Sequence, residues 1–183
     1  EFRGDLVQVG RGPVGADAAT VADEKPFGAV EFGGQLLRRA GLVLAVELDT
    51  ALKPVLEETL ASCSNVKILF GDILKKDIKA IVSEHFEGLR PIVCANLPYN
   101  ITSPLLSAFI DAGVFDTITV MIQREVAQRI CAKPGTSDYG AFSVYVNWHA
   151  EPEILFSVPP DCFVPQPKVT SSVIQLKMRK ESP

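Results

Sequence analysis

Three polar side chains stand at the ends of short apolar runs and give the clearest chemical signal in the sequence. They are Glu47, Asp72 and Asn96. If the runs are neighbouring parallel strands, the three side chains meet at one edge of a sheet, where such folds bind ligands. An acid after one strand can accept hydrogen bonds from ribose hydroxyls, and an acid after the next can accept one from an adenine amino group. The competing interpretation is that Glu47 and Asp72 only cap the following helices.

The tetrapeptide Asn96-Leu97-Pro98-Tyr99 has the form of a loop that methyltransferases use on exocyclic amino groups. An adenine N6 amine is a poor nucleophile because its lone pair is delocalised into the ring. The side-chain oxygen of Asn96 and the carbonyl of Leu97 can each accept one N–H, which holds the nitrogen in line with a methyl donor. Pro98 stiffens the loop, and Tyr99 offers a flat face for an unstacked base. The alternative is an ordinary strand-to-helix turn.

Strand and helix signals alternate along the chain, which predicts a parallel sheet built from βαβ units. The predicted strands cover residues 42–46, 66–70, 91–95, 117–122, 153–158 and 173–178. The predicted helices begin near Asp49 or Thr50, cover 78–85, run from a Ser103-Pro104 start to Gly113, and cover 124–132. Residues 140–149 are ambiguous between helix and strand. The sequence therefore predicts one α/β domain over residues 1–183, with a mostly parallel sheet, helices on both faces and an antiparallel edge formed by the last strands.

Composition limits the classes of function. The chain has 183 residues, 47% of them hydrophobic, and a net charge of −4, which argues against coating nucleic acid through charge. Residues 120–183 nevertheless carry a balance of +1. We expect no metal site, because four cysteines without a Cys-x-x-Cys pair and two isolated histidines provide no ligand pattern. Free cysteines, no secretory leader and no membrane-spanning run together predict a cytoplasmic protein.

Four longer stretches extend these signals and resemble one family. They are Asn96–Leu106, Met121–Ile130, Asp138-Tyr139-Gly140 and Phe163–Val173. Together they resemble the rRNA adenine N6,N6-dimethyltransferase family of the KsgA type, over residues 41–179. The resemblance implies a Rossmann-like methyltransferase fold that uses S-adenosylmethionine. It implies N6-dimethylation of two adjacent adenosines in small-subunit rRNA during ribosome biogenesis, by a monomer that binds the small ribosomal subunit precursor.

The resemblance also assigns roles to matching residues. Glu47 is similar to the ribose-binding acid, Asp72 to the adenine-contacting acid, and Asn96 to the catalytic loop residue beside the cofactor. Phe163 is similar to a second aromatic that packs the target adenine against Tyr99, although without the resemblance we would interpret it as a core side chain. Four basic side chains are candidates for RNA phosphate contacts: Arg124, Arg129, Lys133 and Lys168.

The amino-terminal part departs from the family. A glycine-rich loop should follow the first strand and let the backbone approach the cofactor. Gly10, Gly12 and Gly15 have that spacing, but Gly10 lies 37 residues before Glu47, against about 20 in such units. A rival placement at Gly33 is too close to Glu47 for a loop and a full helix. We prefer Gly10 and Gly12 as the cofactor loop and regard about the first 40 residues as atypical.

The resemblance covers a catalytic domain only. We expect the family's closing amino-terminal segment and its carboxyl-terminal helical domain to be absent from this chain, so its activity alone is in question. Two alternatives stay open. One is the same chemistry on another substrate, by an Erm-like large-subunit rRNA enzyme or a DNA adenine methyltransferase. The other is a non-catalytic RNA-binding or assembly protein with a defective cofactor loop.

Overall fold

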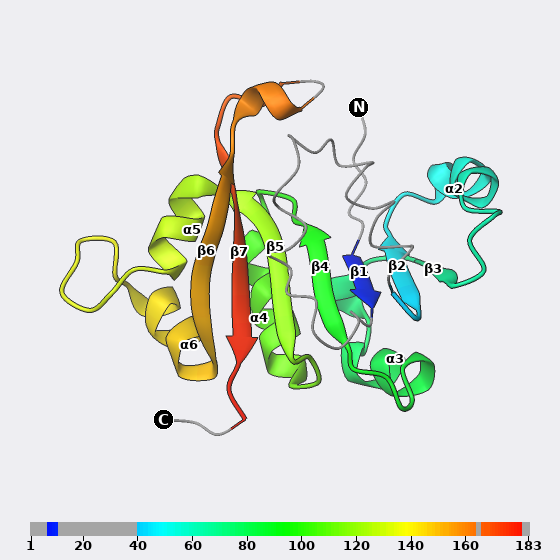
Figure 1. Ribbon diagram of the computed structural model, residues 1–183, viewed down its shortest axis with the longest axis horizontal. Helices are drawn as coiled ribbons and strands as arrows, with labels where there is room; N and C mark the ends of the chain where they lie inside the picture. The colour runs from blue at the N-terminus through cyan, green and yellow to red at the C-terminus, as the bar shows by residue number, and fades with distance from the viewer. Residues whose placement is uncertain (1–6, 11–39, 164–165, 181–183) are drawn as a thin grey trace.

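The fold is a seven-stranded sheet with the strand order β3-β2-β1-β4-β5-β7-β6 (Figure 1). The computed structural model describes residues 7–10, 40–163 and 166–180. The strands are β1 (Val7–Gly10), β2 (Val43–Glu47), β3 (Val66–Phe70), β4 (Ile92–Asn96), β5 (Thr117–Gln123), β6 (Ala150–Val158) and β7 (Ser171–Met178). Five of the seven point the same way, and β7 runs against both β5 and β6. The predicted mostly parallel sheet with an antiparallel edge is thus confirmed.

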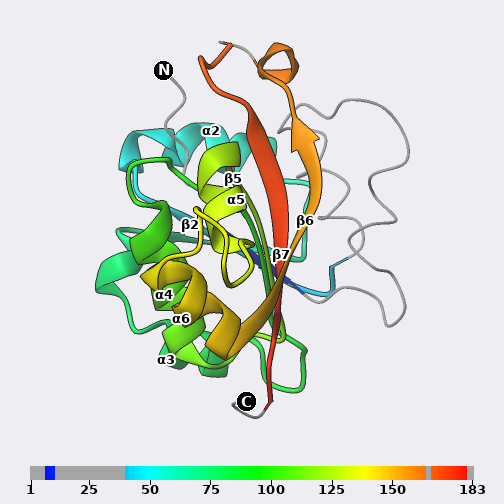
Figure 2. The same ribbon diagram turned by 90° about the vertical axis from the view of Figure 1, so that its left-hand side faces the viewer.

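Helices connect the strands, as the alternating pattern predicts. They are η2 (Thr50–Leu52), α2 (Lys53–Thr59), η3 (Ile73–Lys75), α3 (Ile78–His85), α4 (Thr102–Ala112), α5 (Arg124–Ile130), α6 (Ala141–His149) and η4 (Pro160–Cys162). Figure 2 shows α3, α4, α5 and α6 together on one side of the sheet. Among the described residues, no helix is both long and apolar enough to cross a membrane.

The main core lies between these four helices and the strands β4, β5 and β7. Its largest fully buried side chains include Phe109 of α4, whose ring meets Phe115 edge-on at a centroid distance of 5.9 Å. Ile118 and Ile122 of β5 and Ile174 of β7 face the same layer. Each such side chain contributes about 1.5–3 kcal/mol when it leaves water. This layer therefore fixes where β4 and β5 end.

The start of α4 differs from the prediction by two residues. The helix begins at Thr102 rather than after a Ser103 cap, and Ile101 at the N-cap position makes no side-chain cap bond. The Thr102 hydroxyl instead donates to the Pro98 carbonyl at 3.0 Å, which ties the first turn to the preceding loop. At the other end, Gly113 takes the left-handed conformation with φ of 62°, as its predicted role as a helix stop requires.

The first strand runs in an unexpected direction. A glycine loop that follows a parallel first strand would lie beside the ends of β2 and β4. The structure instead pairs β1 antiparallel with both neighbours, so that Val7 lies opposite Val46 and Gly10 opposite Val43. A four-residue strand that ends in glycine contains few side chains to specify its pairing. The glycine spacing alone therefore could not give the strand's direction.

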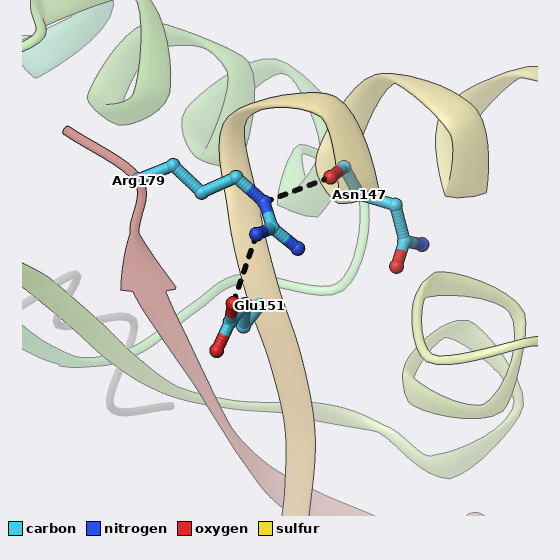
Figure 3. A network of polar contacts seen from close by, with 3 residues as sticks. All are labelled: Asn147, Glu151 and Arg179. Carbon is cyan, nitrogen blue, oxygen red and sulfur yellow. Dashed lines mark hydrogen bonds and ion pairs between the residues drawn. The ribbon is translucent and has the colours of Figure 1, made fainter. Parts of the chain in front are cut away.

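A polar cluster fixes the corner where α6 turns directly into β6 (Figure 3). Arg179, just after β7, donates from Nε to the Asn147 carbonyl at 3.3 Å and from Nη1 to Glu151 Oε1 at 2.8 Å. Its backbone N–H also donates to the His149 carbonyl at 2.9 Å. Because the ion pair is largely exposed, it adds little energy, and its effect is mainly to hold the end of β7 against this corner.

Candidate active site

The carboxyl ends of the parallel strands meet at one edge of the sheet, which we call the carboxyl edge. Glu47 lies opposite Phe70 at the ends of β2 and β3, and Asn96 lies opposite Met121 on β5. The strand β6 also ends here, and η4 follows it, at the top of Figure 1. The sequence prediction that Glu47, Asp72 and Asn96 follow three parallel strands therefore agrees with the topology.

Glu47 is held in a fixed orientation. It is only 2% exposed, and its Oε1 accepts the Asp49 backbone N–H at 2.7 Å. Its own carbonyl accepts the Gly71 N–H at 2.8 Å, which couples the end of β2 to the turn after β3. A carboxylate has about four acceptor positions, so Glu47 keeps capacity for ligand hydroxyl groups.

Asp72 follows a turn that requires glycine. Gly71 has φ of 127°, a conformation that side chains rarely adopt, and it directs Asp72 away from the strand. Asp72 Oδ1 accepts the Leu74 N–H at 3.0 Å, and Oδ2 lies 3.7 Å from Lys75 Nζ. The competing interpretation as a helix cap is thus correct for Asp72, which caps η3. Capping uses part of the carboxylate's acceptor capacity and leaves the rest for a ligand.

The loop from Asn96 to Tyr99 is anchored on both sides of its reactive atoms. Leu97 donates its N–H to the Met121 carbonyl at 3.1 Å, and its side chain is buried in the core. The Pro98 carbonyl accepts from Thr102 and Ile101. Among the described residues, no protein hydrogen bond uses the Asn96 side chain or the Leu97 carbonyl. These two oxygens are therefore available to accept N–H groups of a bound amine.

Two aromatic side chains reach the carboxyl edge from different segments. Tyr99 is 37% exposed, and its hydroxyl lies 2.8 Å from the Ser171 Oγ. Phe163 is half-buried directly after η4. Among the described rings, no contact joins Phe163 to Tyr99. The structure thus places both side chains at one edge. Their joint role in packing a base stays a prediction.

Gly10, one of the two glycines proposed for the cofactor loop, does not lie at this edge. Gly10 lies opposite Val43 at the start of β2, whereas Glu47 stands at the end of that strand. Gly12, Gly15 and Gly33 lie outside the described residues. Because β1 is antiparallel to β2, the end of β1 points away from the carboxyl edge. The described residues therefore show Glu47 and Asp72 at the site and do not show a glycine loop beside them.

The four basic candidates for RNA contact, Arg124, Arg129, Lys133 and Lys168, are all exposed. Arg124 is tied to the edge because its backbone N–H donates to the Thr170 carbonyl at 3.0 Å. It also lies 3.8 Å from Glu125, an exposed ion pair that costs little to break. The Arg124 guanidinium is therefore held only weakly by this pair.

Two of the four cysteines have surroundings that favour the protonated thiol. Burial raises the pKa of the Cys94 thiol to about 12. Burial and then the charge of Glu153 raise the pKa of Cys131 to about 11. Both thiols stay protonated at neutral pH, and thiolates are the reactive form. No group of three metal-binding side chains occurs within the described part of the chain.

Two residues that fix the loop, Thr102 and Ser171, were not among the predicted site residues. Both are buried, and both bond to the Pro98-Tyr99 segment. Thr102 lies within the stretch from Asn96 to Leu106 that carried the family resemblance, just before the predicted Ser103-Pro104 helix start. Ser171 lies within the stretch from Phe163 to Val173 that carried the family resemblance, so that stretch pointed to its region without giving its role.

The strand order, the reversed β7 and the polar carboxyl edge define the class of Rossmann-like methyltransferases. A dimethyladenosine transferase from Plasmodium falciparum has a similar structure, with a TM-score of 0.70 and 25% identity over 84% of this chain and 54% of that one. The 23S rRNA methyltransferase ErmE shares the fold, with a TM-score of 0.69 and 24% identity over 90% of this chain and 66% of that one. The family model for ribosomal RNA adenine dimethylase matches residues 28–183, and the chain belongs to this family. Gly10 and Gly12 precede the matched residues.

Curated relatives agree with this assignment. The ribosomal RNA small subunit methyltransferase A of Ligilactobacillus salivarius is 49% identical over 151 residues, which cover 81% of this chain and 51% of the relative. The protein of the same name from a Geobacillus strain is 43% identical over 176 residues, or 91% of this chain and 60% of the relative. The chain thus spans between half and three-fifths of the length of these relatives.

Proposed function

We propose that the chain carries the catalytic part of an S-adenosylmethionine-dependent enzyme that dimethylates N6 of two adjacent adenosines in small-subunit rRNA. The observation that carries this proposal is the pair of available oxygens, on Asn96 and Leu97, at the same sheet edge as Glu47 and Asp72. The names of the relatives support the small subunit as the substrate.

The described residues fit the adenosine half of the cofactor. Glu47 would accept hydrogen bonds from the ribose hydroxyls, and Asp72 would accept one from the adenine amino group. Both keep acceptor capacity beyond their own backbone bonds. The bound cofactor supplies an electrophilic methyl group. The sequence predicts Gly10 and Gly12 for its methionine half, but Gly10 lies opposite Val43, at the other end of β2 from Glu47, so Gly10 is left out of this proposal.

The loop holds the attacking amine. The Asn96 side-chain oxygen and the Leu97 carbonyl each accept one N–H of the adenine N6, which fixes the nitrogen's direction. Neither oxygen is a titrating base, so positioning and electrostatics provide the catalysis. After one methylation a single N–H remains, and one of the two acceptors still suffices to orient it. Tyr99 and Phe163 would stack the target base once it leaves its helix or loop.

The names of the relatives and the family resemblance add a partner and a place to the proposal. The partner is small-subunit rRNA within a ribosomal precursor, in the cytoplasm, and the enzyme acts as a monomer. Arg124, Arg129, Lys133 and Lys168 would contribute phosphate contacts, which position RNA without reading its sequence.

Methyl transfer to three substrates tests the proposal. Labelled S-adenosylmethionine is offered with unmethylated small ribosomal subunits, naked large-subunit rRNA or duplex DNA. We expect label only in the small subunits, recovered as N6,N6-dimethyladenosine. Label in the large-subunit rRNA or the DNA would instead support the corresponding alternative enzyme.

Calorimetry with the cofactor separates an enzyme from a binding module. A folded sample that binds no S-adenosylmethionine would contradict the enzymatic proposal for this chain and favour a non-catalytic RNA-binding protein. Binding without transfer to any of the three substrates would contradict the proposed substrate.

A further inference from the structure

The Tyr99 side chain is tied to a distant and rigid part of the fold. Its hydroxyl lies 2.8 Å from the Oγ of Ser171, although the two residues are 72 positions apart in the sequence. Ser171 is fully buried and opens β7, where it is paired with Gln123 of β5 and with Val158 of β6. Because two strand ladders hold it, Ser171 cannot move without disturbing both.

The backbone of the same residue is fixed separately. The buried Thr102 hydroxyl donates to the Pro98 carbonyl at 3.0 Å and lies 3.5 Å from the Tyr99 carbonyl. One bond therefore holds the start of the tyrosine and another holds its tip. The ring between them is still 37% exposed and can present a face to a ligand.

We propose that Ser171 is a positioning residue for methyl transfer, which holds the Tyr99 ring at a fixed angle as the platform for the target base. The inference rests on the proposed function, because it deepens the role of the Asn96–Tyr99 loop. A ring attached only through its backbone turns about two side-chain bonds. The bond to Ser171 removes that freedom before the base arrives, so a larger share of bound adenines has N6 aligned with the Asn96 and Leu97 oxygens.

A purely structural role for the same bond predicts a different pattern. If Ser171 only tied β7 to the loop, its loss would lower stability and loosen the whole edge, which would weaken cofactor binding as well. A positioning role predicts a lower kcat, while the KM values for cofactor and RNA change by less than about twofold. RNA affinity comes mainly from phosphate contacts, which the ring does not make.

A double-mutant cycle in the full chain tests the proposal with unmethylated small subunits as substrate. Ser171→Ala and Tyr99→Phe each remove one partner of the bond and keep the ring. Each should lower kcat by roughly three- to tenfold, the factor expected for loss of one neutral hydrogen bond. The double variant should be no slower than either single variant, because both act through one contact. Normal kcat in Ser171→Ala, or multiplying effects in the double variant, would overturn the proposal.

The neighbouring serine provides a matched control. Ser172 is equally buried, in the same strand, and its side chain points to the opposite face because successive strand residues alternate. Its Oγ lies 3.4 Å from the Ser157 Oγ, away from Tyr99. Ser172→Ala should keep kcat within about twofold of the unchanged chain, as expected for a residue without contact to the loop.

A spectroscopic measurement keeps the test independent of activity. The chain has three tyrosines, and Tyr99→Phe identifies the ring signals of Tyr99 in a ¹³C-tyrosine NMR spectrum. Ser171→Ala should shift these signals and leave those of Tyr139 and Tyr145 in place, while Ser172→Ala should shift none of them. Unchanged Tyr99 signals in Ser171→Ala would refute the positioning role even in a sample that transfers no methyl group. A clear shift in such a sample would support it, and the failure would then lie with the proposed function.

Discussion

The two sides of the carboxyl edge are packed very differently. On one side, α2 contains no buried residue and β3 is buried only in part. On the other, β4 and β5 are covered by α4 and α5, whose inner faces are fully buried. Asp72 belongs to the first side and the Asn96–Tyr99 loop to the second. We call the side formed by β4, β5, α4 and α5 the rigid side. The loop proposed to orient the target amine lies on this side. Asp72, one of the acids proposed for the cofactor, lies on the other side, where fewer of the described side chains are buried.

The contrast predicts unequal costs for removing apolar side chains. Phe109→Ala opens a cavity beside Phe115 in the rigid side and should lower the free energy of unfolding by about 3–5 kcal/mol. Val55→Ala in α2, where the side chain is 52% exposed, should change it by less than about 0.5 kcal/mol. Urea unfolding measures both. Similar losses in the two variants would show that the two sides are packed alike.

The second prediction concerns the rigid side's chemistry. Asn96→Ala should lower kcat by about 100- to 1000-fold, the usual effect of deleting one preorganised polar group at a reacting centre. Since Asn96 is exposed at the end of β4, the unfolding midpoint should stay the same. Gln128→Ala removes an exposed amide from α5 and serves as the control with normal kcat. An Asn96→Ala variant that turns over normally would refute the role proposed for the loop.

The third prediction concerns the acid at the end of β2. Glu47→Gln keeps the shape and the bond to Asp49 but removes the charge, so the Kd for S-adenosylmethionine should rise about 10- to 100-fold. Asp77→Asn is the matched control, because Asp77 caps α3 through the Ala80 N–H and an asparagine caps equally well. Calorimetry that gives the same Kd for Glu47→Gln and the unchanged chain would argue against a cofactor role.

The smallest effect is a pH dependence of Tyr145 in α6, whose hydroxyl donates to Asp111 of α4. Burial, and then the hydrogen bond and charge of Asp111, raise the pKa of Tyr145 to about 12. A raised pKa means that the fold favours the neutral phenol, so this stabilisation is complete below the ordinary value of 10.0 and is lost as the pH rises through about 12. The difference in unfolding free energy between the unchanged chain and Tyr145→Phe should therefore shrink between pH 10 and pH 12. A constant difference would contradict the shift.

Local patterns predicted most of the elements of the fold. The strand Val66–Phe70 and the helix Ile78–His85 have the bounds that their apolar spacing indicates. Residues 140–149 were ambiguous because Phe142, Val144, Val146 and Trp148 alternate with a period of two, as in a strand. Residues 141–149 form α6, since Val146 packs into the core and the Ser143 Oγ accepts the Gly140 N–H at the first turn. Tertiary packing determines that this segment is helical, and such packing is not visible in a local sequence pattern.

The site could be predicted to the extent that it depends on strand ends. Glu47 and Asn96 follow directly from where apolar runs stop. The bond between Tyr99 and Ser171 could not be predicted, because it depends on β7 entering the sheet 72 residues later. The direction of β1 also escaped prediction, since the spacing of Gly10 and Gly12 does not specify which neighbour the strand meets or which way it runs.

The position of β7 governs the order in which the molecule can assemble. It is the last described strand in the sequence, yet it lies between β5 and β6, and it reaches back from Lys177 to Thr117 across 60 residues. During synthesis, the edges of β5 and β6 that pair with β7 stay unpaired until β7 leaves the ribosome. Contacts of such long range form slowly. Ser171 therefore joins Tyr99 late, so the complete site would arise only after nearly the whole described chain has been made.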